Sequence, residues 1–394
     1  MRIALDYRPA LKPNSRRRGI GRFTRELTQA LLECADRPPL LLYTLPGSES
    51  NVPRHPAVTW RAVPYLRRPS RLNWILEAFC LPRRIRADGI DLLHSLDPVA
   101  APHRPQERVL WTVHDLIPYI FAEETRRNVP WDFRVALRWA WRGLRRAAHV
   151  VAISEATRRD LVRWAGLPEE RIYVVPPGSA IPPPGGSVME NRRRAAAELG
   201  LPDRFLLYVG GTDFRKNLGF LMEGFARVCA EGYEGELVLV GETFVTRLPE
   251  VVRLRRQAEA LGVAARVHWL DWIPDDRLAV LYRAADALVF PSLYEGFGLP
   301  VLEAMRCGGV VLAARTSAVP EVGGDVAYYF DPGDVESFAA TFAAFRAAPE
   351  ERGRRRELGR RRAAAFTWER SAARLLEIYR EICGAPKAQR EGAR

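Results

Sequence analysis

Short apolar runs of strand length alternate with longer amphipathic segments along almost the whole chain, and this alternation limits the folds available to it. In the first half the apolar runs predict strands at Ile3–Tyr7, Leu40–Tyr43, Leu92–Ser95, Val109–His114, Val150–Ile153 and Tyr173–Val175. In the second half they predict strands at Phe205–Val209, Leu237–Val240, Val267–Trp269, Ala287–Phe290 and Val310–Ala313. The predicted helices between them include Gly21–Cys34, Trp131–Arg146, Leu218–Cys229, Leu248–Ala260 and Pro300–Cys307. Strands that alternate with helices in this way form parallel sheets covered on both faces.

The stretch VPPGSAIPPPGGS separates the two series and holds five prolines and three glycines in thirteen residues, which marks a break in compact structure. A chain of 394 residues also exceeds one ordinary core, so two domains are expected. The predicted fold class is α/β, with two doubly wound, Rossmann-like domains that face a cleft. The expected divisions are a first domain over 1–180, a linker over 181–204, a second domain over 205–365 and a C-terminal helix over 366–384. In such sheets ligands bind beyond the carboxyl ends of the strands.

The formal net charge is +13 and comes almost wholly from arginine, since the chain has three lysines, Lys12, Lys216 and Lys387. A basic surface of this kind attracts phosphate, nucleic acid or an anionic membrane. Arginine-rich runs such as ERGRRRELGRRR are also typical of ordinary solvated faces, and this interpretation is favoured for most of them. No recognised nucleic-acid-binding motif is present, so nucleic acid is not an expected partner.

The cysteines and the N-terminus bear on the cellular location of the chain, and the histidines bear on metal binding. Five scattered cysteines without a CxxC pair favour reduced thiols and a cytoplasmic setting. The six histidines show no metal-ligand spacing. The start MRIALDYRPA is predicted as a strand, so no signal peptide is expected, and no apolar run approaches the roughly 18 residues of a membrane span.

The stretch FPSLYEGFGLPVLEAMRCG places two carboxylates, Glu295 and Glu303, around a glycine-rich turn that opens a helix. Pro300 suits a first helical position and Gly308 a position just past the helix end. The free N–H groups of such a helix start can bind an anion. Glu303, expected on the first turn, is placed to accept hydrogen bonds from a vicinal diol such as ribose. The alternative is a helix start that acidic residues merely stabilise.

The stretch LLYVGGTDFRKNLGF carries a second anion-binding pattern. Gly210 and Gly211 turn the chain after a predicted strand, and Arg215 and Lys216 precede a helix that starts near Leu218. A glycine-rich loop, two cations and a helix start together suit a diphosphate. The pattern GxxxxGK[ST] of a P-loop is absent. A tight turn with solvated cations is the alternative.

The first half carries weaker patterns. Gly19 and Gly21 open a helix near Phe23, which could close over a phosphate or a sugar. His114 follows a buried strand and could bond a sugar hydroxyl or transfer a proton, or it could be a structural histidine. Asp115 could orient His114 or have no such role. Ser154 is interpreted as a helix cap.

The stretch WDFRVALRWAWRGLRRAAH predicts a basic amphipathic helix. Arg134, Arg138 and Arg142 recur every four residues, among tryptophans and aliphatic residues. Two interpretations stand. The helix could rest on a membrane surface. It could also be an ordinary surface helix whose aromatic residues lie in the core, and this is favoured.

Five motifs in this order carry a family resemblance: TVHDLIP, ISEATRRDL, GGTDFRKNL, FPSLYEGFGLPVLEAMRCG and PEVGGDVAYYFDP. The chain from Met1 to about Tyr379 resembles retaining GT-B glycosyltransferases of family 4, also called group 1, which include mannosyl- and rhamnosyltransferases. The two glutamates eight residues apart in EGFGLPVLE are close to a signature. The resemblance implies that the first domain binds the acceptor and that the second binds a nucleotide-diphosphate sugar.

The resemblance also implies roles for individual residues. Arg215 and Lys216 would neutralise the leaving diphosphate, and Glu303 would hold the ribose. Glu295, together with backbone amides of the next four residues, would hold the donor sugar. The implied catalytic residues are Glu295, His114, Lys216 and Arg215. The implied donor-binding residues are Gly21, Gly210, Gly211, Arg215, Lys216, Glu295, Gly296, Phe297, Gly298, Leu299 and Glu303. No metal or other cofactor is expected, because protein cations would take its place.

The expected function is transfer of a hexose, with mannose from GDP-mannose favoured, to a glycan or lipid-linked acceptor in cell-surface polysaccharide biosynthesis. Peripheral contact with the inner membrane face is a further expectation. Two departures from the family pattern leave base and sugar open: Pro176-Pro177-Gly178 stands in place of PNG, and Arg315–Glu321 in place of SNxSSxPE. The alternatives are a GT-B nucleotide-sugar epimerase and a non-catalytic sugar-nucleotide-binding protein.

Overall fold

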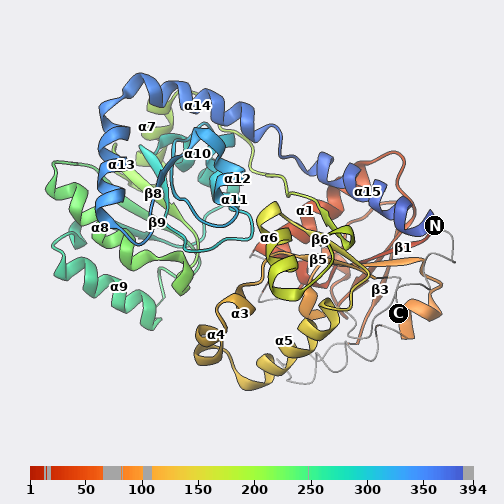
Figure 1. The fold of residues 1–394 in the computed structure, drawn as a ribbon. Helices are drawn as coiled ribbons and strands as arrows, with labels where there is room; N and C mark the ends of the chain where they lie inside the picture. The colour runs from red at the N-terminus through yellow and green to blue at the C-terminus, as the bar shows by residue number, and fades with distance from the viewer. Residues whose placement is uncertain are drawn as a thin grey trace. The chain divides into compact units, whose positions relative to one another are not determined.

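The computed structural model describes residues 1–12, 15, 19–64, 81, 83–100, 109–246 and 248–384. It consists of two compact units, Met1–Gly178 with Trp368–Arg394, and Ser179–Thr367. Figure 1 shows that each unit is a sheet with helices packed against it. Within the described ranges, no helix is long and apolar enough to cross a membrane.

The first unit contains a parallel sheet in the order β3-β2-β1-β4-β5-β6-β7. Its strands are β1 (Ile3–Asp6), β2 (Leu40–Thr44), β3 (Val58–Ala62), β4 (Leu92–Ser95), β5 (Val109–Val113), β6 (His149–Ala152) and β7 (Ile172–Val174). Its helices include α1 (Gly19–Glu33), α3 (Ile117–Ile120), α4 (Ala122–Asn128), α5 (Trp131–Leu144), α6 (Glu155–Asp160) and α15 (Trp368–Gly384). The strands from β1 to β5, apart from β3, are buried along their whole length, as expected for strands covered on both faces.

The second unit repeats this scheme with a parallel sheet in the order β10-β9-β8-β11-β12-β13. Its strands are β8 (Phe205–Val209), β9 (Glu236–Val240), β10 (Val267–Leu270), β11 (Ala287–Phe290), β12 (Val311–Ala314) and β13 (Tyr328–Phe330). Its helices are α7 (Val188–Leu199), α8 (Leu218–Ala230), α9 (Pro249–Ala260), α10 (Asp275–Ala284), α11 (Leu299–Arg306), α12 (Val319–Gly323), α13 (Val335–Ala347) and α14 (Pro349–Ala363). One group of helices, α8, α9 and α13, packs together, and α7, α10, α11, α12 and α14 form the other group (Figure 1).

The α/β fold class with two doubly wound parallel sheets is confirmed. Two strands were not predicted from the sequence, and both lie at a sheet edge. Strand β3 is largely exposed, and β13 has only three residues. The range 181–204, expected as a linker, instead contains α7, which begins with a capping box between Ser187 and Glu190. Arg192 on α7 pairs with Asp286 and bonds the carbonyl of Ala284, so this helix is part of the second unit.

The C-terminal helix α15 is part of the first unit and packs against α1. The hydroxyl of Tyr379 on α15 lies 2.6 Å from Nδ1 of His94 on β4. On the other side of the ring, Nε2 of His94 lies 2.6 Å from the hydroxyl of Thr112. The imidazole therefore joins helix α15 to the centre of the sheet through two hydrogen bonds.

This buried imidazole makes the stability of the first unit sensitive to acid. Burial lowers the pKa of His94 from 6.5 to about 3. Between pH 6.5 and about pH 3 the imidazole is protonated in the unfolded chain but neutral in the folded chain. The free energy of unfolding therefore falls as the pH is lowered through this range. We expect denaturant titrations to show a contribution of up to about 1.4 kcal/mol per pH unit.

Two variants separate the titration of His94 from its packing. His94→Gln should lower stability at pH 7 and flatten its pH dependence, because the titrating group is gone. Tyr379→Phe should also lower stability at pH 7, by about 1 kcal/mol, but keep the slope, because the imidazole remains. Equal slopes for His94→Gln and the wild-type protein would contradict the assignment.

Candidate functional site

Two loops of the second unit meet at the point where its strand order reverses. The chain leaves β8 through residues 210–217 and leaves β11 through residues 291–298, and these two strands are neighbours in the sheet. The loops are joined by a hydrogen bond of 2.7 Å from the backbone N–H of Leu293 to the carbonyl of Arg215. Such a switch point, at the carboxyl ends of parallel strands, is where doubly wound sheets bind ligands.

The two loops bring together three of the predicted charged residues. Nζ of Lys216 lies 2.6 Å from Oε1 of Glu295, and Nη1 of Arg215 lies 2.9 Å from Oε2 of the same carboxylate. Lys216 and Glu295 are each 8% exposed. Burial alone would raise the pKa of Glu295, but Lys216 and Arg215 outweigh it and hold that pKa below its usual range. Nε of Arg215 also lies 2.8 Å from Oδ1 of Asp213, so the cluster joins two basic side chains to two carboxyl groups.

The glycines of the first loop lie where backbone segments approach one another closely. A Cβ atom on Gly210 would lie 2.6 Å from the hydroxyl oxygen of Tyr208. A Cβ atom on Gly241, which follows β9, would lie 2.1 Å from the carbonyl oxygen of Gly210. The hydroxyl of Tyr208 donates to the carbonyl of Gly211 at 2.8 Å and fixes the turn. The turn before Arg215 and Lys216 is thus held by a hydrogen bond and leaves no room for a side chain at Gly210.

The second loop leads into α11 much as the glycine and proline pattern indicates. Gly298 has a φ of 108°, a conformation that side chains other than glycine rarely adopt, and Pro300 lies in the first turn. Gly308 follows the helix with a φ of 72°. Of the other predicted donor-binding residues, Gly296 and Phe297 lie in the loop and Leu299 is the first residue of α11.

The position of Glu303 differs from the prediction. Because α11 begins at Leu299, Glu303 is the fifth residue of the helix and lies on its second turn. The side chain is 3% exposed and accepts a hydrogen bond of 2.8 Å from the hydroxyl of Tyr282 on α10. The carboxylate is thus oriented from the neighbouring helix.

The sequence analysis assigned no role to two hydroxyl residues that hold the Glu295 loop. The backbone N–H of Glu295 donates to Oγ of Ser317 at 2.8 Å, and Oγ1 of Thr316 donates to the carbonyl of Ser292 at 2.7 Å. Ser317 has a φ of 44°, which is uncommon outside glycine and indicates a conformation maintained by its surroundings. The departure from the family pattern at Arg315–Glu321 was the signal that this segment matters.

The predicted residues of the first unit form a separate group. Nε2 of His114 lies 2.9 Å from the carbonyl of Leu96, and its ring meets Phe23 of α1 edge-on at 4.7 Å between centroids. Burial lowers the pKa of His114, so the neutral ring donates from Nε2 and keeps Nδ1 as an acceptor. Gly21 is buried in the first turn of α1, which begins at Gly19.

Two further residues of the first unit have structural roles. Oδ1 of Asp115 accepts the backbone N–H of Ile117 at 3.1 Å. Oγ of Ser154 accepts the backbone N–H of Thr157 at 3.0 Å, which confirms the predicted cap of α6.

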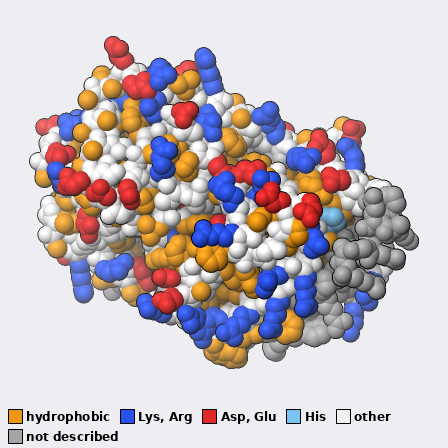
Figure 2. All heavy atoms as spheres, viewed as in Figure 1, with side chains coloured by type: hydrophobic (Ala, Val, Ile, Leu, Met, Phe, Trp, Pro, Cys, Tyr) orange, Lys and Arg blue, Asp and Glu red, His pale blue; other side chains and the backbone are white. Residues whose placement is uncertain are grey.

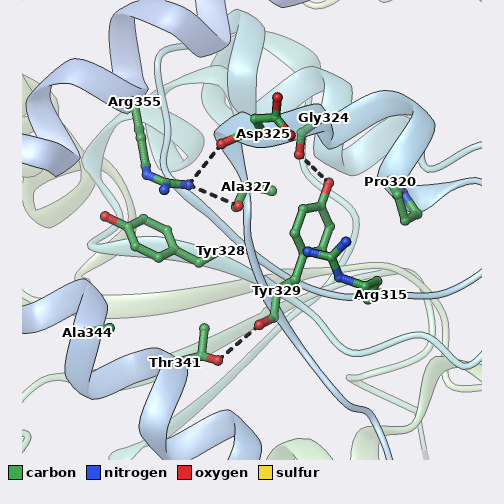
Figure 3. Close-up of a pocket in the computed structure, with 10 residues that line it drawn as sticks. All are labelled: Arg315, Pro320, Gly324, Asp325, Ala327, Tyr328, Tyr329, Thr341, Ala344 and Arg355. Carbon is green, nitrogen blue, oxygen red and sulfur yellow. Dashed lines mark hydrogen bonds between the residues drawn. The ribbon is translucent and has the colours of Figure 1, made fainter.

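A cavity of about 450 Å³ in the second unit contains none of the predicted site residues. It lies along the edge strand β13, where Arg315 covers the ring of Tyr329 at 4.5 Å and Arg355 that of Tyr328 at 4.1 Å (Figure 3). Arg355 also donates to the carbonyls of Asp325 and Ala327. Its guanidinium is therefore engaged in holding the segment before β13, and the cavity is distinct from the charged cluster.

Comparisons with known proteins agree with this architecture. Residues 190–362 match the family model of glycosyl transferases group 1, and residues 17–179 match that of glycosyltransferase family 4. The O-antigen chain mannosyltransferase B of Escherichia coli is 27% identical over 384 residues, which cover 92% of this chain and 96% of that protein.

Solved structures resemble the chain over nearly its whole length. The sucrose-phosphate synthase of Thermosynechococcus elongatus has a TM-score of 0.76 at 22% identity, and the aligned region covers 98% of this chain and 100% of the synthase chain. Alr3699/HepE of Anabaena, solved in complex with UDP and glucose, has a TM-score of 0.70 at 20% identity. The aligned region covers 96% of this chain and 98% of the HepE chain. At these identities the likeness concerns the fold.

Two Rossmann-like units with parallel sheets, together with these structural neighbours, define the GT-B fold. The second half of the chain matches the group 1 glycosyltransferases and the first half matches the family 4 type, and the mannosyltransferase relative aligns with both halves. The family resemblance seen in the sequence is confirmed at this level.

Proposed function

We propose that the chain transfers a hexose from a nucleotide-diphosphate sugar to a glycan or a lipid-linked acceptor, with retention of configuration and without a metal ion. Mannose, carried by GDP, is the favoured donor sugar, because the relative aligned over nearly the whole chain is a mannosyltransferase of O-antigen chains. The same relative supports a role in cell-surface polysaccharide biosynthesis. The proposed setting is the cytoplasm, at the inner face of a membrane.

The observation that carries this proposal is the ionised cluster of Arg215, Lys216 and Glu295 at the switch point. A sugar that leaves a diphosphate develops negative charge on the leaving group and positive charge at its reacting carbon. Fixed cations stabilise the first charge without reorganisation, and an ionised carboxylate suits the second. Arg215 and Lys216 are accordingly assigned to the diphosphate and Glu295 to the donor sugar.

The remaining predicted residues extend this assignment. Gly210 and Gly211 are proposed to let the diphosphate approach the backbone, and the amides at the start of α11 to bind the donor. Glu303 is assigned to the ribose. His114 and Gly21, in the first unit, are proposed as further donor contacts; the acceptor nitrogen Nδ1 suits His114 to a sugar hydroxyl.

An epimerase or a non-catalytic binding protein would share this fold, and neither is favoured. The family matches and the mannosyltransferase relative support a transferase. A non-catalytic descendant would also have no need to retain both glutamates and both cations of the site.

The proposal is tested by thermal unfolding in the presence of UDP-, GDP-, ADP- and dTDP-sugars, each with EDTA. A ligand that binds the folded state raises the unfolding temperature by mass action, so one base should give a clear increase, with GDP-mannose expected. A shift that needs added metal would contradict the metal-free site. If no donor shifts the wild-type protein, the donor-site assignment fails.

A further inference from the structure

The outer face of α5 combines tryptophans with arginines, and the proposed function does not use it. Trp131 is 61% exposed and Trp139 is 45% exposed, and Arg138 and Arg142 are exposed between and beside them. At 100° per residue these four side chains fall within about a third of the helix circumference. On the opposite face Ala136, Leu137, Ala140 and Leu144 are buried in the core, whereas Phe133, near the helix start, is 45% exposed. The favoured expectation that the aromatic residues of this helix lie in the core is therefore wrong for Trp131, Phe133 and Trp139.

This surface continues past the end of α5. Nε of Arg145 donates to the carbonyl of Ala165 at 3.2 Å, which places the helical turn of residues 161–165 beside α5. That turn carries Trp164, which is 46% exposed and lies under the guanidinium of Arg163 at 5.1 Å. Figure 2 shows hydrophobic and basic side chains side by side along the lower edge of the view, where α5 lies in Figure 1.

The grouping is more than a scatter of single exposed residues. Five tryptophans are exposed in the described part of the chain, and three of them, Trp131, Trp139 and Trp164, lie on this surface. Residues 131–146 hold five arginines and one acidic residue. Exposed apolar groups that gather in one place mark an interaction surface.

We propose that this face of α5 binds the headgroup region of an anionic phospholipid bilayer. Tryptophan favours the boundary between headgroups and acyl chains, and arginine pairs with lipid phosphates while its stem covers apolar surface. The surface is one face of a helix rather than a charged groove, which favours a bilayer over single-stranded nucleic acid. The inference rests on the proposed function only in that a lipid-linked acceptor would lie in the same bilayer.

The test measures binding of the whole protein to vesicles by flotation. Vesicles of phosphatidylcholine mixed with phosphatidylglycerol should bind the wild-type protein, and vesicles of phosphatidylcholine alone should bind it weakly. Arg138→Glu with Arg142→Glu should weaken binding by roughly tenfold or more, since each basic residue near an anionic surface adds a substantial increment. Trp131→Ser with Trp139→Ser should weaken binding without any change in charge.

Matched controls use other exposed helices and tryptophans. Arg253→Glu with Arg256→Glu reverses two exposed charges on α9, and Trp60→Ser with Trp272→Ser removes two tryptophans that are 44% and 47% exposed. Both controls should bind vesicles like the wild-type protein. Absent binding by wild type overturns the proposal, as does wild-type binding by either α5 variant. A soluble polyanion serves as a second ligand for the wild-type protein and the tryptophan variant. If the two proteins bind the polyanion equally and also bind vesicles equally, charge alone explains the binding, and the proposal is overturned.

These outcomes are independent of the donor site. Vesicle binding needs neither donor nor acceptor, so it can succeed even if no nucleotide sugar shifts the unfolding temperature. Conversely, the α5 variants should keep the donor-induced shift of the wild-type protein, which also verifies that they are folded.

Discussion

Replacing Lys216 with alanine is expected to remove most sugar transfer and to destabilise the second unit. The loss of one fixed positive group that stabilises charge in the transition state lowers kcat by about 10²- to 10³-fold. The folded state also loses the partner of a buried carboxylate, because Lys216 lies 2.6 Å from Glu295. Removing one member of a buried ion pair costs about 3–5 kcal/mol, and the lower end is expected here because Arg215 still contacts Glu295.

A double-mutant cycle separates the two effects. In Lys216→Ala with Glu295→Gln the unpaired carboxylate is gone, so the free energy of unfolding should recover in part. Transfer should not recover, because neither the cation nor the carboxylate is restored. Lys12→Ala, which removes a lysine of the first unit, controls for the change in net charge and should transfer sugar normally. Wild-type rates in Lys216→Ala, or a double variant that regains activity, would refute the assignment.

The pH dependence of the stability of the Lys216→Ala variant is a second test of the pairing between Lys216 and Glu295. In the wild-type protein the pKa of Glu295 lies below its usual value, so the pair contributes stability at neutral pH that is lost as the pH falls. Without Lys216, burial should raise this pKa, and the carboxyl group should take up a proton in mild acid. The destabilisation caused by Lys216→Ala should therefore shrink on going from pH 7 to pH 4. A constant difference between variant and wild type would show that Glu295 does not respond to Lys216.

The sequence predicted the sheets and the charged cluster because both depend on local patterns. A buried parallel strand is a short apolar run, and each of the runs named above coincides with a strand to within about a residue. The cations and Glu295 each follow such a run, so the topology alone brings them to one edge of the sheet. The loop glycines and Pro300 are likewise required by local backbone geometry.

What the sequence did not predict depends on contacts between distant segments. Tyr379 bonds His94 across 285 positions, and no local pattern links the two residues. Ser317 holds the N–H of Glu295 from the next loop, and its positive φ is not visible in its residue type. Glu303 was expected on the first turn because the helix start was judged from Pro300, whereas the helix begins one residue earlier, at Leu299. The strand β3 is largely exposed and so lacks the apolar run that marked the others.

Glu303→Gln is expected to weaken nucleotide-sugar binding through the ribose and not through the diphosphate. The substitution keeps the size of this buried side chain but removes the charge that strengthens hydrogen bonds from ribose hydroxyls. Each such bond to a charged group contributes about 1.5–3 kcal/mol, so the Kd should rise at least about tenfold. Tyr282→Phe should have a smaller effect in the same direction, because it removes the hydroxyl that orients Glu303 and leaves the charge.

The contact can be assigned to the ribose by changing the ligand as well as the protein. The nucleoside diphosphate of the preferred base is compared with its 2′,3′-dideoxy analogue by calorimetry on the wild-type protein and on Glu303→Gln. If Glu303 binds the diol, the substitution weakens the normal nucleotide but hardly changes binding of the analogue, since the bond is already missing there. An equal loss for both ligands would mean that Glu303 only packs α11 against α10. The ribose contact would then have to be sought elsewhere around the switch point, since the position of Arg215 and Lys216 does not depend on Glu303.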